Sequence, residues 1–166
     1  MPDATVAVEV AYEERYWYPD DGGEVWVAGY HVVDPGSGRY LGRDAPELVA
    51  RGLRIAGVAG AAQHHRDVLE TDAAGPGRPL ALRRDAANPH DPNAIAVEVA
   101  DGAQLGWVPR ELAAELAGEL DGGRPWSAVV LRERRASPRD ARAGVTMLLV
   151  AAPGVELRVR PRSPRS

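Results

Sequence analysis

The chain has 166 residues, no cysteine and a net charge of −4 at neutral pH. This length allows one complete hydrophobic core with an appendage and excludes two large domains. The lack of cysteine excludes disulfides and thiolate metal sites, and no segment approaches the roughly 20 apolar residues of a membrane span. We therefore expect a soluble, cytoplasmic protein.

The charges are distributed unevenly along the chain. Residues 1–50 contain 10 acidic residues against 3 arginines, residues 51–150 contain 13 of each, and residues 151–166 contain 1 against 4. All 20 basic residues are arginine, which together with abundant Ala, Gly and Pro indicates the codon bias of a GC-rich bacterial genome. Each arginine is therefore weaker evidence of guanidinium chemistry than usual.

The first third of the chain has the alternating pattern of β-strands. Residues 5–12 and 24–33 are rich in Val and aromatic residues with a period of two, and the acidic turn 20–23 separates them. These features predict a β-hairpin. Asp44 is an N-cap candidate followed by a proline in the first turn, and it predicts a short helix over residues 45–51.

From residue 53 onward the chain contains short strand-like segments separated by Gly-rich turns. The strands expected are residues 53–59, 79–84, 94–100, 104–108, 126–135 and 145–152. A helix is expected over residues 110–120, where leucines recur at every fourth position. This composition indicates a mainly β fold with short helices, built as a small, strongly curved sheet or barrel.

The most informative segment is residues 88–97, NPHDPNAIAV, followed by LGWVP at residues 105–109. Its two prolines restrict the backbone before any ligand arrives, so the loop is stiff. A stiff loop that presents two asparagines, a histidine and an aspartate together is typical of a binding site.

These elements, with Arg84-Asp85 before the loop and a Leu-rich helix that ends at Asp121-Gly122, resemble a HIRAN domain over roughly residues 53–152. The resemblance implies a modified OB-like β-barrel that captures the 3′ end of single-stranded DNA in a small pocket. It also implies a role in DNA repair or replication-fork processing. We accordingly expect an acidic hairpin extension over residues 1–52, the HIRAN-like barrel over residues 53–152 and a flexible basic tail over residues 153–166.

Four positions of the family's pocket are matched by this chain. His90 stands where the family has an aromatic residue that stacks on the terminal base, and Asp91 matches the acid that accepts a hydrogen bond from the terminal hydroxyl. Trp107 matches a second ring, and Arg110 matches the basic residue at the start of the helix. A carboxylate repels phosphate, so Asp91 suits a polyanion only at a terminus, where a hydroxyl replaces the next phosphate.

The family's first strand supplies an arginine and an aromatic residue that this chain lacks over residues 57–63. His64, His65 and Arg66 follow directly and are candidate replacements. Arg84 is a further candidate for a charge-assisted phosphate contact. Stacking contributes about 1 to 3 kcal/mol per base and does not distinguish one base from another, so we expect binding to tolerate different sequences. The phosphate contacts should make the binding sensitive to salt.

Each candidate also has a purely structural interpretation. The alternatives are Asx-turns closed by Asp91 and Asn93, a core position for Trp107, a solvated helix end for Arg110 and a cross-strand pair of Arg84 with Glu98. A zinc site among His31, His64, His65 and His90 is not expected, because adjacent histidines in a strand point to opposite faces.

The expected function is therefore non-enzymatic nucleic-acid binding without a cofactor. The chain lacks lysine, and so lacks a P-loop, and none of its serines lies in a Gly-x-Ser-x-Gly elbow. A helicase or nuclease partner would supply any catalysis. Two alternatives remain: an interaction adaptor that offers an exposed sheet edge at residues 24–33 for β-augmentation, and a metal-assisted hydrolase that uses Asp91 and the histidines.

Overall fold

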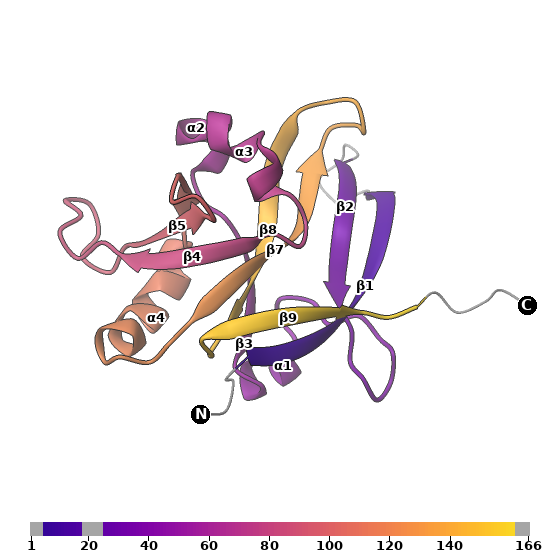
Figure 1. Ribbon diagram of the computed structural model, residues 1–166, viewed down its shortest axis with the longest axis horizontal. Helices are drawn as coiled ribbons and strands as arrows, with labels where there is room; N and C mark the ends of the chain where they lie inside the picture. Colours follow the sequence, from indigo (N-terminus) through magenta and orange to yellow (C-terminus); the bar gives the residue numbers. More distant parts are fainter. Residues whose placement is uncertain (1–4, 18–24, 162–166) are drawn as a thin grey trace, which may run out of the picture.

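The computed structural model describes residues 5–17 and 25–161, and these residues form a strongly bent sheet with short helices around it (Figure 1). The strands are β1 (Thr5–Trp17), β2 (Val25–Val32), β3 (Leu53–Gly57), β4 (Pro79–Arg84), β5 (Ile95–Val99), β6 (Gln104–Trp107), β7 (Ser127–Arg135), β8 (Arg142–Val150) and β9 (Gly154–Val159). The helices are α1 (Pro46–Ala50), α2 (Ala61–His64), α3 (Arg66–Leu69), the 3-10 helix η1 (Asp72–Ala74) and α4 (Arg110–Asp121). The mainly β fold expected from the sequence is confirmed.

Strand β7 is the centre of the sheet. The strand order is β6-β5-β4-β7-β2-β1-β9, while β8 pairs with the other edge of β7 and with β3. The first half of β7 pairs with β4 and its second half pairs with β2, so the sheet branches there. Register shifts in the β7–β8 pair accompany the bend.

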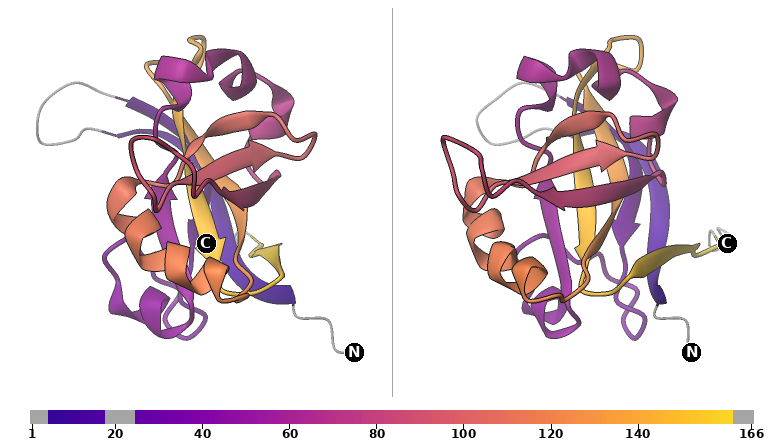
Figure 2. Two further views of the ribbon diagram at one scale, coloured as in Figure 1. Left: turned by 90° about the vertical axis from the view of Figure 1, so that its left-hand side faces the viewer. Right: turned by 60° about the vertical axis from the view of Figure 1, so that its left-hand side comes forward.

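The sheet is open in its strand pairing, so the closed barrel expected from the sequence is not confirmed. One isolated antiparallel bridge, between Ala59 and Trp107, links the segment after β3 to β6. The helix α4 lies along one side of the molecule, beside the loop that joins β4 to β5 (Figure 2).

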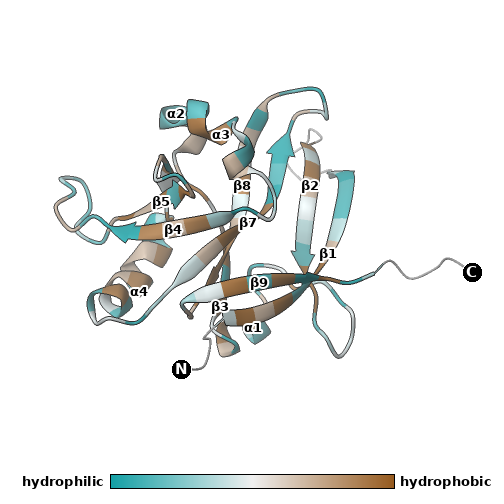
Figure 3. Ribbon diagram, viewed as in Figure 1, coloured by the Kyte–Doolittle hydropathy of each residue, from teal (hydrophilic) through white to brown (hydrophobic). Residues whose placement is uncertain are grey.

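Both faces of the β7–β8 pair are buried, which explains the unbroken apolar run in β8. Residues that alternate along these strands enter two different hydrophobic clusters. One cluster contains Ala128, Val130, Val145, Met147 and Leu149, together with residues of β4, β5, β6 and α4. The other contains Val129, Leu131, Leu148 and Val150, together with residues of β1, β2, β3 and α1. Accordingly, the first half of β7 is hydrophobic, whereas the far ends of β1 and β7 are hydrophilic (Figure 3).

The β-hairpin expected in the first third is confirmed, because β1 and β2 pair antiparallel from Val10 with Val32 to Trp17 with Val25. Its expected turn at residues 20–23 lies outside the described residues. The exposed edge expected at residues 24–33 is wrong, because β2 lies between β1 and β7. Period-two alternation identifies a strand but not its neighbours, and here both edges of β2 have partners.

The C-terminal segment also differs from expectation. Residues 154–159, predicted as part of a flexible tail, form β9, which pairs parallel with the first half of β1. Val155 and Leu157 are partly buried against the second hydrophobic cluster. The long-range pairing with β1, which local composition does not reveal, orders this segment.

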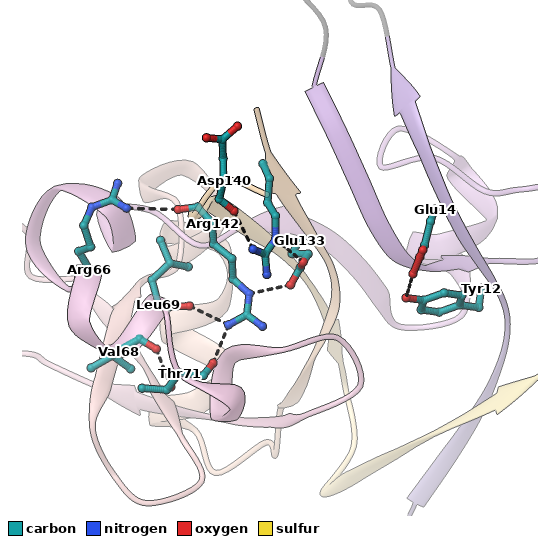
Figure 4. Close-up of polar contacts among 10 residues, drawn as sticks. Tyr12, Glu14, Arg66, Val68, Leu69, Thr71, Glu133, Asp140 and Arg142 are labelled. Atoms are coloured by element: carbon teal, nitrogen blue, oxygen red, sulfur yellow. Dashed lines mark hydrogen bonds and ion pairs between the residues drawn. The ribbon is translucent and has the colours of Figure 1, made fainter. Parts of the chain in front are cut away.

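A buried ion pair fastens the small helices to the β7–β8 hairpin (Figure 4). Arg142 Nε donates to Glu133 Oε2 at 2.6 Å, and Arg142 Nη1 donates to the carbonyl oxygens of Leu69 and Thr71 at 2.9 and 2.6 Å. Arg135 Nε donates to the other oxygen of Glu133 at 2.6 Å. Arg66 of α3 adds a contact in the other direction, from its Nη1 to the carbonyl of Arg142 at 3.4 Å. The segment from α3 to η1, which the sequence did not predict as helical, is therefore attached to the hairpin by two arginines.

Among the described residues, no helix is long and apolar enough to cross a lipid bilayer.

Candidate nucleic-acid interface

Asn88 organises the loop between β4 and β5. Its Oδ1 accepts hydrogen bonds from the backbone N–H groups of His90 at 2.8 Å and Asp91 at 3.1 Å, while its Nδ2 donates to Asp85 Oδ2 at 3.2 Å. Asn88 is partly buried, and His90 is exposed. Asn88, which the sequence suggests as a binding residue, thus shapes the loop, whereas His90 is exposed on it.

Asp91 has a divided role. Its Oδ1 accepts a hydrogen bond from the backbone N–H of Asn93 at 2.9 Å, which is the Asx-turn considered as a structural alternative. Its Oδ2 lies 3.9 Å from Arg110 Nε, too far for a direct hydrogen bond. The Asp91 side chain is 18% exposed and that of Arg110 is 79% exposed. One carboxylate oxygen therefore remains available beside a solvated guanidinium at the start of α4.

Arg84 is committed to another acid. Its Nε and Nη2 donate to both oxygens of Asp121 at 2.9 and 3.1 Å, and its Nη1 donates to the carbonyl of Ala94 at 2.9 Å. The hydrogen bond from Arg84 holds the pKa of the Asp121 carboxyl below its usual range. The alternative pair with Glu98 is made instead by Arg83, at 2.6 Å. Arg84 thus ties the start of the loop to the end of α4, and little of its guanidinium remains for a phosphate.

Trp107 and His64 border the same glycine. A Cβ atom at Gly60 would lie 3.4 Å from Trp107 Cδ1 and 3.5 Å from His64 Cδ2. Gly60 has a φ of 76°, a left-handed conformation that glycine adopts without strain. Trp107 is partly buried, and the two hydrogen bonds of its bridge with Ala59 measure 2.8 and 2.9 Å. The structure therefore places one of the two candidate histidines and the tryptophan around the same glycine.

Register places Trp107 on the outer face of the β4–β5–β6 sheet. Trp107 is opposite Ala96, and Ala96 is opposite Arg83, whereas their neighbours in β5 face the core. Arg83 is therefore an exposed cation in the same cross-strand row as Trp107, a position that the sequence analysis missed. The alternation in β4 predicts that Arg83 points away from the core. Only the strand register shows that it lies in the same cross-strand row as Trp107.

The other histidines lie apart from this row. His65 is partly buried at the junction of α2 and α3, where its backbone N–H donates to the carbonyl of Ala61 at 2.9 Å. His31 stacks on Tyr40 with ring centroids 4.8 Å apart. In residues 5–17 and 25–161, no group of three or more His, Asp or Glu side chains is placed to hold a metal ion.

Two surface hollows occur elsewhere and neither is lined by the β4–β5 loop. One, of about 340 Å³, has an apolar lining from Tyr30, β7 and β9. The other, of about 390 Å³, lies between the β1–β2 pair and Arg135 and Arg142. The candidate interface lies outside these two hollows, and its parts are the Asp91–Arg110 pair and the Trp107 and His64 side chains around Gly60.

A mainly β sheet whose β4–β5 loop meets the start of α4 is the fold of a small domain with a candidate binding surface. Residues 55–143, more than half of the chain, match the model of the HIRAN domain. The chain belongs to the HIRAN domain family, which consists of binding domains associated with nucleic acids. The resemblance inferred from the sequence is thereby confirmed.

Two solved structures are similar to this chain. The HIRAN domain of human HLTF is 29% identical, with 59% of this chain and 74% of that chain covered and a TM-score of 0.44. A protein from Lactobacillus plantarum is 22% identical, with 58% of this chain and 91% of that chain covered and a TM-score of 0.45. No curated protein matches the chain.

Proposed function

We propose that this protein is a non-enzymatic module that captures the 3′ end of single-stranded DNA. The observation that supports this most directly is the state of Asp91, which uses one oxygen to shape its own loop and keeps the other 3.9 Å from Arg110. A domain that holds free 3′ ends serves in DNA repair or replication-fork processing, and a helicase or nuclease partner performs any catalytic step.

The free oxygen of Asp91 accepts the hydrogen bond of a terminal 3′-hydroxyl. A 3′-phosphate or a continuing strand would bring a second negative charge to the same place, so both are rejected. Arg110 binds the phosphate that precedes the terminal nucleotide, where a flexible and solvated guanidinium can form charge-assisted hydrogen bonds. End selectivity and affinity thus come from two neighbouring side chains.

The rings hold the last bases without identifying them. His90 projects from the loop and stacks on the terminal base, and Trp107, with His64 beside it, stacks on a base further along the strand. Arg84 acts as a positioning residue that anchors the loop to α4. His65, partly buried between two helices, orients His64.

The test is a comparison of short single strands that end in a 3′-hydroxyl or a 3′-phosphate, measured by fluorescence anisotropy. The wild-type protein should bind the hydroxyl-ended strand about tenfold more tightly, a difference of roughly 1.4 kcal/mol. Asp91→Asn retains an oxygen for the Asn93 N–H but removes the charge, so this variant should bind both strands with nearly equal affinity.

Asp101→Asn is the matched control, because it also removes one acidic charge and keeps an oxygen for the backbone N–H that it serves, that of Ala103, but leaves Asp91 and the Arg84–Asp121 anchor in place. It should preserve the preference for the hydroxyl. Equal affinity of the wild-type protein for both strands would refute end capture.

A further inference from the structure

Two arginines of β7 are partly buried and have no acidic partner in the part of the chain that the structure describes. Within the described residues, the guanidinium of Arg132 makes one hydrogen bond, in which Nη1 donates to the carbonyl of Tyr30 at 3.0 Å, and the Arg134 side chain makes no hydrogen bond or ion pair. The other described arginines that lack an acid are exposed, and they are Arg39, Arg43, Arg51, Arg78 and Arg139. A buried cation without an anion is costly, so Arg132 and Arg134 require an explanation.

The surrounding backbone leaves room for these side chains. Arg134 lies over Gly144, its partner in β8, where a Cβ atom would overlap the guanidinium. A Cβ atom at Gly57 in β3 would lie 4.0 Å from Arg134 Nη1. Arg132 is opposite Gly29 in β2, where a Cβ atom would overlap Arg132 itself. Glycine in three neighbouring strands thus gives the arginines space on one face of the sheet.

The local charge is positive. Burial, followed by the charges of Arg43 and Arg134, lowers the pKa of Arg132 to about 10, and burial and Arg43 also lower the pKa of Arg134. These causes mean that the three guanidinium groups repel one another. The nearby Glu13 is already engaged, since its carboxylate pairs with Arg15 and accepts a hydrogen bond from Tyr40.

This arginine cluster (Arg43, Arg132 and Arg134) is connected to the candidate interface through one short segment. Gly57, beside Arg134, is two residues before Ala59, which bridges Trp107. Ala56 and Val58 point into the core, so Gly57 and Ala59 share the opposite face. A strand that stacks on Trp107 can therefore continue along this face toward the arginines.

We infer that Arg43, Arg132 and Arg134 form a second phosphate-binding site, which holds the sugar–phosphate backbone of a single strand behind its captured end. This inference rests on the proposed function for the identity of the ligand. Phosphate groups neutralise the repulsion between the arginines and satisfy their free N–H groups, which no acid within residues 5–17 and 25–161 does. The site reads charge and not sequence.

The experiment compares oligothymidylates of about 4 and about 12 nucleotides, because a single-strand site spans about 4 to 16 nucleotides. The variants are Arg134→Gln and Arg43→Gln, and the second replaces an exposed residue whose side chain makes no hydrogen bond or ion pair with the described residues. Each should bind the long strand about tenfold more weakly. The slope of log K against log salt should flatten by about 0.7 per lost phosphate contact. Binding of the short strand and the preference for a 3′-hydroxyl should not change. Arg78→Gln is the matched control, an exposed arginine outside the cluster.

His31 provides an independent readout, because the charge of Arg132 contributes to the lowering of its pKa to about 4 after burial, the main cause. Neutralisation of Arg132 by phosphate should raise the pKa of His31, which NMR measures on the intact protein with the long strand and without it. His90 reports on the end site in the same spectra.

The two proposals fail in different ways. If Arg43→Gln and Arg134→Gln bind the long strand no more weakly than Arg78→Gln, and the pKa of His31 stays constant, the second site is refuted while end capture stands. If these variants bind the long strand more weakly but the wild-type protein binds 3′-hydroxyl and 3′-phosphate strands with equal affinity, end capture is refuted while the phosphate site stands.

Discussion

Arg110 Nε lies 3.9 Å from Asp91 Oδ2, close enough for attraction and too far for a hydrogen bond. The pair joins two segments that are distant in the sequence, the β4–β5 loop and the start of α4. Its two members differ in their contacts, because Asp91 is fixed by its Asx-turn whereas the Arg110 side chain is exposed and makes no hydrogen bond with any described residue, so it can bind another anion. This difference suits a site in which Asp91 determines selectivity for the strand end and Arg110 determines affinity.

Arg110→Gln should separate those two roles. Loss of the guanidinium should weaken the binding of hydroxyl-ended and phosphate-ended strands alike, by about tenfold at low salt, and leave their ratio unchanged. Thermal stability should stay the same, because an exposed ion pair contributes at most about 1 kcal/mol. Anisotropy titrations at several salt concentrations provide the measurement. A changed ratio would show that Arg110 contributes to the choice of end.

Asn88→Ala should disorganise the loop. The substitution leaves the backbone N–H groups of His90 and Asp91 without their acceptor, at a cost of about 1 to 2 kcal/mol in the free energy of unfolding. Binding of single strands should fall with it, because His90 and Asp91 lose their fixed positions. Urea denaturation and anisotropy measure the two effects.

Asp85→Ala is the comparison for Asn88→Ala. It removes only the partner of Asn88 Nδ2 and leaves both backbone hydrogen bonds to Oδ1 in place. Its effect on binding should therefore be smaller. Equal losses in the two variants would mean that Asn88 acts through Asp85 rather than through the backbone.

The sequence was sufficient for the local elements. Alternation predicted the β1–β2 pair, and the leucine spacing predicted α4, because each signal depends on residues close together in the chain. It did not predict that β9 orders the C-terminal segment or that β2 is enclosed by β1 and β7. Those features depend on pairing between distant segments, for which a strand's own residues give no signal.

The same limit applies to the candidate site. The motif directed attention to Asp91 and Arg110, and these two residues do lie together. The alternative pair of Arg84 with Glu98 is wrong by one residue, because Arg83 makes it and a shift of one residue reverses the face of a strand. Arg132 and Arg134 looked ordinary in a chain whose basic residues are all arginine. Only their burial without an acid distinguishes them.

The N-terminal third of the chain is an integral part of the fold. Val8, Val10 and Val32 are buried in the cluster that contains Leu131 and Leu148 of the central strands. The excess of acidic residues in residues 1–50 should repel nucleic acid, but removal of this segment would expose the core and confound any measurement of that repulsion. Charge substitutions on the exposed face of β1 are the appropriate variants.

The buried Glu133 should dominate the acid sensitivity of the fold. Burial disfavours its charged form, but the hydrogen bonds from Arg135 and Arg142 outweigh burial and lower its pKa from the ordinary 4.5. A lowered pKa in the folded state stabilises the protein above pH 4.5, and this contribution is lost as the pH falls through the lowered value. Glu133→Gln should cost about 3 to 5 kcal/mol at pH 7, because it leaves the buried Arg142 without its anion.

The difference in the free energy of unfolding between the wild type and Glu133→Gln should therefore narrow as the pH falls below 4.5. Urea denaturation at a series of pH values measures this difference. Asp121→Asn is the control, since its carboxyl also has a lowered pKa through Arg84 but is largely exposed and screened by solvent. This control should show a small gap at every pH. A gap for Glu133→Gln that stays constant into acid would mean that the charge of Glu133 is not what stabilises the attachment of α3 and η1 to the sheet.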